Sequence, residues 1–268
     1  MTHRLSPTRT LSATRLDATK LDRTGRPAVG FLSALVDINA AQVALLASQP
    51  RWTATAALAL HSSGRTAAGT LVSDARLVRI GSTLIVVRAS VHDASGADPD
   101  EVLDAMSDDV DVDVSAMPRI ASAVLTFARI PAEASVASAT YDPSTSPARS
   151  RLESSCAARP DPLADRLGTV VTGPGTIEMH PAAYTRNSFG TVFGGAYGML
   201  FQAAGESLGP DLVATDLDVQ YLSQTEAGPV VVHAEVVRDD QHRVVCDVAA
   251  VVGSKTLSIG SITLARSG

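Results

Sequence analysis

The residues best suited to chemistry lie in one glycine-rich stretch, Asn187 to Glu206. Gly190, Gly194 and Gly195 stand too close together for a regular helix or strand, so this part of the stretch predicts a turn. The residues after them are apolar on nearly all faces, which is typical of a buried helix. Backbone N–H groups at the start of such a helix have no partner within it, and the helix dipole favours negative charge there. The stretch therefore predicts a site for an oxygen that carries partial negative charge.

A second apolar stretch, Ala28 to Ala47, ends before Pro50 and contains a single acid, Asp37. Burying an unpaired carboxylate is costly, and desolvation raises its pKa. We therefore predict that Asp37 acts as a general base or a nucleophile. The alternative is that Asp37 makes an ordinary polar contact on the helix, with Asn39 and Gln42 as neighbours.

Strand-like segments rich in Val, Ile and Thr follow the glycine-rich helix. They are Val213–Tyr221, Pro229–Val237, Val244–Val252 and Leu257–Leu264. One buried helix followed by consecutive strands, without a βα alternation, predicts an α+β fold in which an antiparallel sheet wraps around a helix.

The two halves of the chain repeat each other. When Gly30 is aligned with Gly195, Asp37 falls on Gln202, at an offset of 165 residues. Three further pairs of segments align: Thr55–His61 with Ala214–Gln220, Ala75–Arg79 with Ala234–Arg238, and Thr126–Arg129 with Thr263–Arg266. The offset falls only where loops could differ in length, and the acidic insert around 92–117 explains its last change.

The motif Asn-x5-Phe-Gly-Gly, Asn187 to Gly195, resembles the Asn-x5-His-Gly-Gly signature of PaaI-like hotdog-fold acyl-CoA thioesterases. The direct resemblance covers residues 170–268, and the repeat extends it to a tandem, double-hotdog form. That form implies two antiparallel sheets, each around a long central helix, joined as a pseudo-dimer. The chain departs from the family at Phe193, where a His is usual, and at Gln202, where the catalytic acid is usual.

The resemblance implies one complete site between the halves. Asn187 and the N–H of Gly194 would face Asp37, with Thr55 (or its rival Thr53) holding the water or the carboxylate. Gly195, Phe193 and Gln202 are predicted to contact the substrate, an acyl-CoA. In the mirror-related site Gln202 would face Val29, and that site should be inactive. Apolar side chains either line an acyl tunnel or belong to the core: Phe31, Trp52, Met199 and Phe201.

Each of these residues also has a structural interpretation. Asn187 could be only a turn former before Gly190, and Gly194 and Gly195 could serve only close helix packing. Thr55 could be an ordinary strand residue, and Gln202 a hydrogen-bonded core amide.

The predicted organisation is a flexible tail (1–10), an N-terminal hotdog domain (11–131), a linker (132–168) and a C-terminal hotdog domain (169–268). The net charge of −6 comes from the acidic segment Asp98 to Asp113, and the near-neutral remainder argues against nucleic-acid binding. Two cysteines make neither a disulfide framework nor a zinc site. We expect no metal, no cofactor and no membrane contact, since no run of about 18 apolar residues is evident. We further expect a cytoplasmic location and assembly into a homo-oligomer of pseudo-dimers.

Other functions remain open at this stage. Hotdog hydratases and dehydratases use a pair of His with Asp or Glu, and no such pair is evident beside Asp37 or Gly194. A non-catalytic acyl-CoA or lipid binder would keep the glycine turn but tolerate loss of Asp37. A third alternative is a protein that serves only assembly. The second half keeps Asn187 and Gly194-Gly195 but lacks the acid, whereas the first half keeps Asp37 but has Asp22 in place of the Asn and Ala28-Val29 in place of the His-Gly pair. These losses are complementary, which favours an enzyme.

Overall fold

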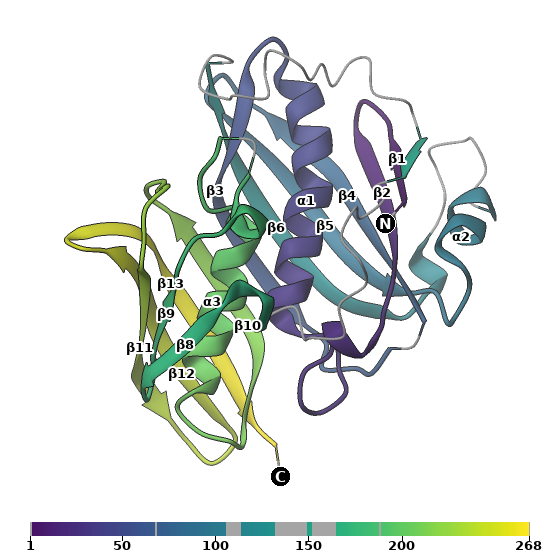
Figure 1. Ribbon diagram of the computed structural model, residues 1–268. Coiled ribbons are helices and arrows are strands. Elements are labelled where there is room, and N and C mark those ends of the chain that lie inside the picture. Colours follow the sequence, from purple (N-terminus) through teal and green to yellow (C-terminus); the bar gives the residue numbers. More distant parts are fainter. Residues whose placement is uncertain are drawn as a thin grey trace.

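The computed structural model describes residues 2–67, 69–105, 114–131, 149–151, 165–187 and 189–267. Two long helices, α1 (Val29–Ser48) and α3 (Gly194–Glu206), lie on one side of a large antiparallel sheet (Figure 1). Most of the predicted linker, including Cys156, and positions 106–113 of the acidic insert lie outside the described residues.

The sheet has thirteen strands within the described ranges, in the order β7-β1-β2-β4-β5-β6-β3-β10-β13-β12-β11-β9-β8. The strands of the N-terminal half are β1 (Thr2–Leu5), β2 (Arg9–Arg15), β3 (Trp52–Ser62), β4 (Thr70–Ile80), β5 (Leu84–Asp93) and β6 (Arg119–Ile130). After the short β7 (Arg149–Arg151), those of the C-terminal half are β8 (Thr169–Gly173), β9 (Thr176–Met179), β10 (Leu212–Tyr221), β11 (Val230–Asp239), β12 (Arg243–Val252) and β13 (Lys255–Arg266).

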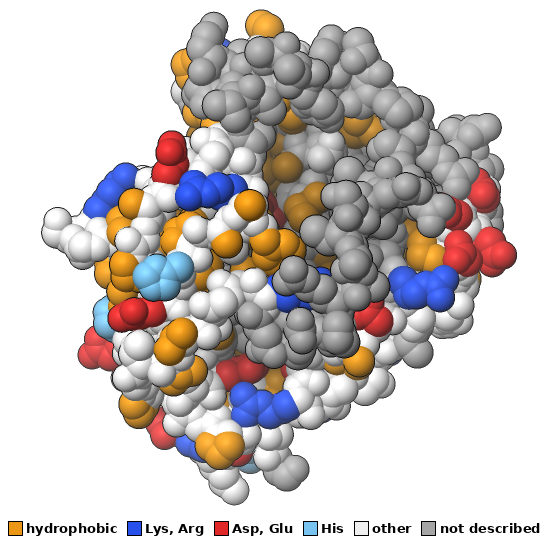
Figure 2. Space-filling model, viewed as in Figure 1, with side chains coloured by type: hydrophobic (Ala, Val, Ile, Leu, Met, Phe, Trp, Pro, Cys, Tyr) orange, Lys and Arg blue, Asp and Glu red, His pale blue; other side chains and the backbone are white. Residues whose placement is uncertain are grey.

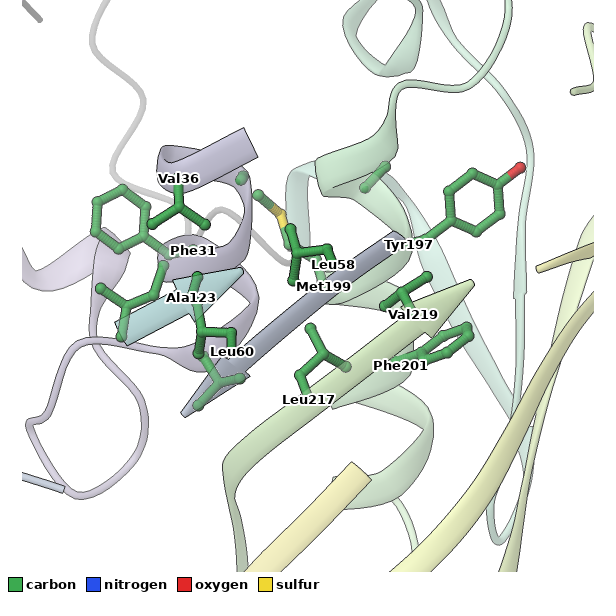
Figure 3. Close-up of a cluster of buried hydrophobic side chains, with 14 of the residues drawn as sticks. Phe31, Val36, Leu58, Leu60, Ala123, Tyr197, Met199, Phe201, Leu217 and Val219 are labelled. Atoms are coloured by element: carbon green, nitrogen blue, oxygen red, sulfur yellow. The ribbon is translucent and has the colours of Figure 1, made fainter. Parts of the chain in front are cut away.

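The two halves share a continuous sheet, whereas the sequence predicts two sheets. β3 and β10 pair directly, and Ala59 stands opposite Asp218. These two residues are also each other's equivalents in the repeat, so the pseudo-twofold relation passes between them. Alternate residues of both strands, among them Leu58 and Leu217, point toward the helices (Figure 3).

The sheet irregularities follow the repeat as well. β3 is bulged against β6 between Thr55 and Ala57, and β10 is bulged against β13 between Ala214 and Asp216. The bulge of β4 after Leu77 likewise corresponds to that of β11 after Val236. A bulge re-aims the side chains beside it, so both halves use the same local geometry at equivalent positions.

The predicted flexible tail is instead ordered strand. Thr2–Leu5 pairs with β2 on one side and with β7 on the other. The next strand buries Arg9, whose guanidinium forms an ion pair with Asp74 at 2.7 Å. The sequence does not predict the buried start of this strand, because part of its buried surface is an ion pair and not a hydrophobic side chain.

Helix α1 has the length and apolarity of a membrane span, with a mean hydropathy of 1.7, so the expectation that no such run exists is wrong. In the fold, however, 78% of that window is buried inside the protein, as in the central helix of a soluble core. A separate short helix, α2 (Pro99–Ala105), lies on the edge of the N-terminal half, and acidic side chains gather over it (Figure 2).

Candidate active site

A cavity of about 850 Å³ lies between the two halves. One wall comes from α1 and the start of β3, and the other from the loop before α3, the first turns of α3 and the end of β10. Hydrophobic side chains gather where the halves meet on this face of the molecule (Figure 2). The structure therefore brings Asp37 of one half and Gly194 of the other into one largely apolar cavity.

Asp37 is buried, with 7% of its surface exposed, and has two hydrogen-bond donors. The Thr55 hydroxyl donates to its Oδ1 at 2.8 Å, and the backbone N–H of Gly195 also donates to the carboxylate. Desolvation outweighs these two bonds and raises the pKa of Asp37 to about 6. The carboxylate is thus mostly ionised at neutral pH, and its pKa is close enough to neutrality for it to accept a proton and release it again. Thr53 lines the cavity, but Thr55 makes the contact with Asp37.

Gly194 is the first residue of α3 and touches the same carboxylate. A Cβ at this position would stand 2.7 Å from Asp37 Oδ2, so only glycine leaves room for it. The Gly194 N–H has no hydrogen-bond partner among the described residues, as expected for the first turn of a helix. Within the described residues, an N–H without a partner therefore belongs to a glycine that touches a buried carboxylate in a cavity.

The loop before α3 is built around Asn187. Its Oδ1 accepts from the backbone N–H groups of Phe189 and Thr191 and from the Thr191 hydroxyl. Gly190, with φ of +76°, completes the turn. Asp22 builds the equivalent loop before α1, accepting from Thr24 and Arg26 in the same way. The side-chain oxygen of Asn187 thus shapes the loop, and its amide nitrogen has no partner among the described residues.

Two tyrosines at the site were missed by the sequence analysis. The Tyr221 hydroxyl donates to the carbonyl of Gly194 at 3.1 Å, and its ring packs edge-on against Tyr197. Both side chains line the cavity, and burial raises the pKa of Tyr197 to about 12. Tyr221 is the last residue of a predicted strand, so only its position at the strand end signals it.

The predicted cavity-lining side chains divide into two sets. Phe31, Trp52, Met199 and Phe193 line the cavity. Phe201 is fully buried in the core between the helix and β13 and does not line the cavity. Gly195 meets Asp37 through its N–H, while its α-carbon side packs against α1.

Gln202 lies outside the cavity, which does not support its predicted contact with substrate. Its Oε1 accepts from the N–H of Gly30 at 2.7 Å, just as Asp37 accepts from Gly195. Its Nε2 donates to Glu206, which also contacts Arg23 at 3.3 Å. The mirror-related position is thus a closed polar network that ties α1 to α3.

Replacing Gln202 with alanine is expected to destabilise the protein by about 1–3 kcal/mol, because Gly30 and Glu206 would each lose a buried partner. Gln202 does not line the cavity, so kcat/KM should stay near the wild-type value at a temperature where the variant is folded. Urea unfolding and initial rates would measure the two effects. Loss of activity without loss of stability would place Gln202 in the active site.

Structural comparison identifies the fold. The chain is similar to a putative oleoyl thioesterase from Lactobacillus plantarum, with 14% identity and a TM-score of 0.60 over 96% of this chain and 95% of that one. It is also similar to a 12:0-ACP thioesterase from Umbellularia californica (10% identity, TM-score 0.59, 96% and 93% coverage). A protein of unknown function with a hot dog fold from Alicyclobacillus acidocaldarius matches with 11% identity and a TM-score of 0.54 over 99% and 96% of the chains.

The class of protein that these likenesses define is the hotdog fold, in which a large antiparallel sheet accompanies few helices. No protein-family model and no curated protein matches the chain by sequence.

Proposed function

We propose that the protein is a double-hotdog thioesterase of the PaaI-like type that hydrolyses an acyl-CoA to the free acid and CoA. One composite active site, between the halves, carries the reaction. The observation that supports this most directly is the close approach of Asp37, with its raised pKa, to Gly194, whose N–H at the start of α3 has no partner among the described residues. The matching bulges and the matching loops of Asp22 and Asn187 support the tandem form.

In the hydrolysis the thioester carbonyl lies at the N-terminus of α3. Asp37 takes a proton from a water molecule as the water oxygen attacks the carbonyl carbon, and the Gly194 N–H stabilises the oxyanion. Collapse of the tetrahedral intermediate breaks the C–S bond, and protonated Asp37 returns its proton to the thiolate. In a second route, Asp37 attacks directly and water then cleaves the mixed anhydride. Thr55 and the Gly195 N–H orient the carboxylate in both routes.

The polar end of the cavity suits the CoA portion. Arg186 and Gln224 line this end, and Arg186 is exposed. The Nζ of Lys255 donates to the carbonyl oxygen of Gln224 at 2.7 Å. Along α1 the cavity is lined by apolar side chains such as Leu35 and Leu45, which suit the acyl chain. An acyl group on a carrier protein has the same thioester, so the test includes both carriers.

The deciding experiment is thiol release from acyl-CoA and acyl-carrier-protein thioesters of short, medium, long and aromatic chains. We expect turnover of at least one acyl-CoA, with kcat/KM rising as pH passes through about 6 and levelling above it, because Asp37 must be ionised. If only carrier-protein thioesters are hydrolysed, the leaving group is the carrier protein and not CoA. Tight acyl-CoA binding without turnover would leave the non-catalytic binder as the function.

Asn187→Asp tests the role of the amide nitrogen of Asn187, because it removes this donor and keeps the oxygen that accepts the loop hydrogen bonds. Because Asp22 builds the equivalent loop with a carboxylate, the variant should keep its stability. We expect kcat/KM to fall about tenfold, since one neutral hydrogen-bond donor to the substrate is lost. Initial rates together with thermal unfolding would measure this, with Asn187→Ala as the comparison that also loses the loop contacts. Unchanged rates in Asn187→Asp would leave Asn187 only a turn former.

A further inference from the structure

The peptide group between Gly194 and Gly195 joins two side chains of the cavity. Its N–H, which belongs to Gly195, donates to the carboxylate of Asp37. Its carbonyl oxygen, which belongs to Gly194, accepts from the Tyr221 hydroxyl at 3.1 Å. One planar peptide group therefore connects the hydroxyl of Tyr221, at the end of β10, with the carboxylate of Asp37 on α1.

The two hydrogen bonds of this peptide group strengthen each other. A donor to the carbonyl oxygen draws electron density from the amide nitrogen, because both atoms belong to one resonance system. The N–H then becomes a better donor, and chains of hydrogen bonds in a low-dielectric interior polarise one another in this way. A carbonyl oxygen has two lone pairs, so the contact with Tyr221 is additional to the hydrogen-bond ladder of α3. The hydroxyl of Tyr221 therefore acts on the charge of Asp37 through the peptide.

The Tyr221 hydroxyl remains a hydrogen-bond donor at neutral and mildly alkaline pH. Burial, and then the nearby carboxylate of Asp37, raises the pKa of this hydroxyl well above its usual value. The three residues also pack at one point. A Cβ on Gly194 would stand 2.7 Å from Asp37 Oδ2 and 3.5 Å from a ring carbon of Tyr221. The tyrosine thus restrains the first turn of α3 on the side that faces the carboxylate.

The mirror-related position of the repeat has no such tyrosine. There the N–H of Gly30 donates to Gln202 at 2.7 Å. The offset of 159 residues that relates β3 to β10 places Ser62 at the position of Tyr221. The Ser62 hydroxyl oxygen accepts from the N–H of Gly64 at 3.2 Å, within its own loop. Of the two equivalent positions, only the one beside the cavity carries a phenol.

We propose that Tyr221 is a positioning residue for the reaction, which holds the Gly194–Gly195 peptide and through it orients and stabilises the ionised carboxylate of Asp37. This role rests on the proposed function, because that function makes Asp37 the base. Without the hydroxyl, the bond from Gly195 weakens and Asp37 should take up a proton at a higher pH. The turn that presents the Gly194 N–H also loses a restraint, so the reacting groups should be less well aligned.

Other titratable side chains near the cavity must be separated from this effect. The loop before α3 and α3 itself contribute Tyr184, Arg186 and Tyr197 to the cavity wall. Asp218 of β10 acts on Tyr221 but is not among the causes of the pKa shift of Asp37. Tyr197 provides the matched control, because its ring packs edge-on against Tyr221 and its hydroxyl has no hydrogen-bond partner among the described residues. Its replacement by Phe removes a neighbouring hydroxyl but no bond to the peptide.

A carboxyl carbon NMR titration of the full chain measures the pKa of Asp37, whose resonance is assigned by its absence from Asp37→Asn. In the wild type the midpoint should lie at about 6. In Tyr221→Phe it should rise by about 0.3–0.5 pH units, and in Tyr197→Phe it should stay at the wild-type value. Tyr221→Phe keeps the ring and its packing against Tyr197, so the variant should fold, and thermal unfolding checks this.

Initial rates give a second readout. In Tyr221→Phe the inflection of kcat/KM should move upward with the NMR midpoint. Above the inflection, kcat should fall about tenfold while KM changes little, because the lost restraint acts on the reacting groups.

An unchanged midpoint in folded Tyr221→Phe, or an equal rise in Tyr197→Phe, would overturn the proposal. The titration needs no substrate, so it is independent of the proposed function. A rise of the midpoint in a protein that hydrolyses no thioester would refute that function and leave the link between Tyr221 and Asp37 standing.

Discussion

Replacing Asp37 with asparagine is expected to lower kcat/KM by roughly 10²–10⁴-fold, the usual contribution of a general base, and to stabilise the folded protein. The loss of activity follows because an amide cannot take a proton from water. The gain in stability follows from burial, since the folded state must keep an ionised carboxylate in an apolar cavity. The new amide can still accept from the Gly195 N–H and donate to the Thr55 hydroxyl, so the local contacts survive.

The stability gained by Asp37→Asn should increase with pH. The pKa of Asp37 rises from 3.8 to about 6 on folding, which corresponds to about 3 kcal/mol. Below pH 4 both states are protonated, and the wild type carries no penalty. As pH rises from 4 through 6, the unfolded state ionises first and the wild type loses stability, and the full difference is present above 6. Urea unfolding of both proteins across this range is the measurement. A constant difference would show that Asp37 is not a buried ionisable group, and unchanged turnover would exclude it as the base.

Substitutions of the two adjacent glycines should differ in effect: one should lower activity, and the other should lower stability. In Gly194→Ala the new Cβ would stand 2.7 Å from Asp37 Oδ2 and displace the carboxylate, so we expect kcat/KM to fall about 100-fold. In Gly195→Ala the new Cβ would stand 2.7 Å from Ala34 Cα in α1. Backbone atoms cannot move aside as a side chain can, so this variant should lose about 1–3 kcal/mol of stability.

Initial rates and unfolding midpoints of the two glycine variants, measured together, test this division. Gly30→Ala is a matched control, because Gly30 holds the mirror-related position, does not itself line the cavity, and its new Cβ would meet the backbone of Met199 at 2.6 Å. It should behave like Gly195→Ala in stability. If Gly194→Ala were destabilised while keeping its activity, the close approach to Asp37 would have no catalytic role.

Many of the helices and strands can be predicted from the sequence because they depend on local patterns of residues. The apolar run from Ala28 to Ala47 predicts α1 (Val29–Ser48) to within a residue at each end, and Gly194 marks the start of α3. The predicted strands of the C-terminal half agree with β10 to β13 to within two residues at each end. Hydrophobic periodicity decides these elements.

What the sequence does not reveal depends on contacts between distant residues. The burial of Arg9 depends on Asp74, 65 residues away, so a basic N-terminal segment resembles a loose tail until the ion pair is known. Gln202 has the same place in the sequence as a catalytic acid, but Gly30 and Glu206 occupy its hydrogen bonds. Tyr221 reaches Gly194 only because β10 ends beside the glycine turn.

The equivalence of Asp37 and Gln202 also bears on how such a protein can diverge. In a dimer of identical chains, the same residue occupies both mirror-related positions. It therefore cannot be catalytic at one of them and serve only helix packing at the other. Fusion of the two halves removes that constraint. In this chain one copy of the position carries the buried carboxylate of Asp37, the proposed base, and the other carries the amide of Gln202, which holds the helices together. Because the halves are covalently linked, the two equivalent positions can carry different residues, which a symmetric assembly of identical chains does not allow.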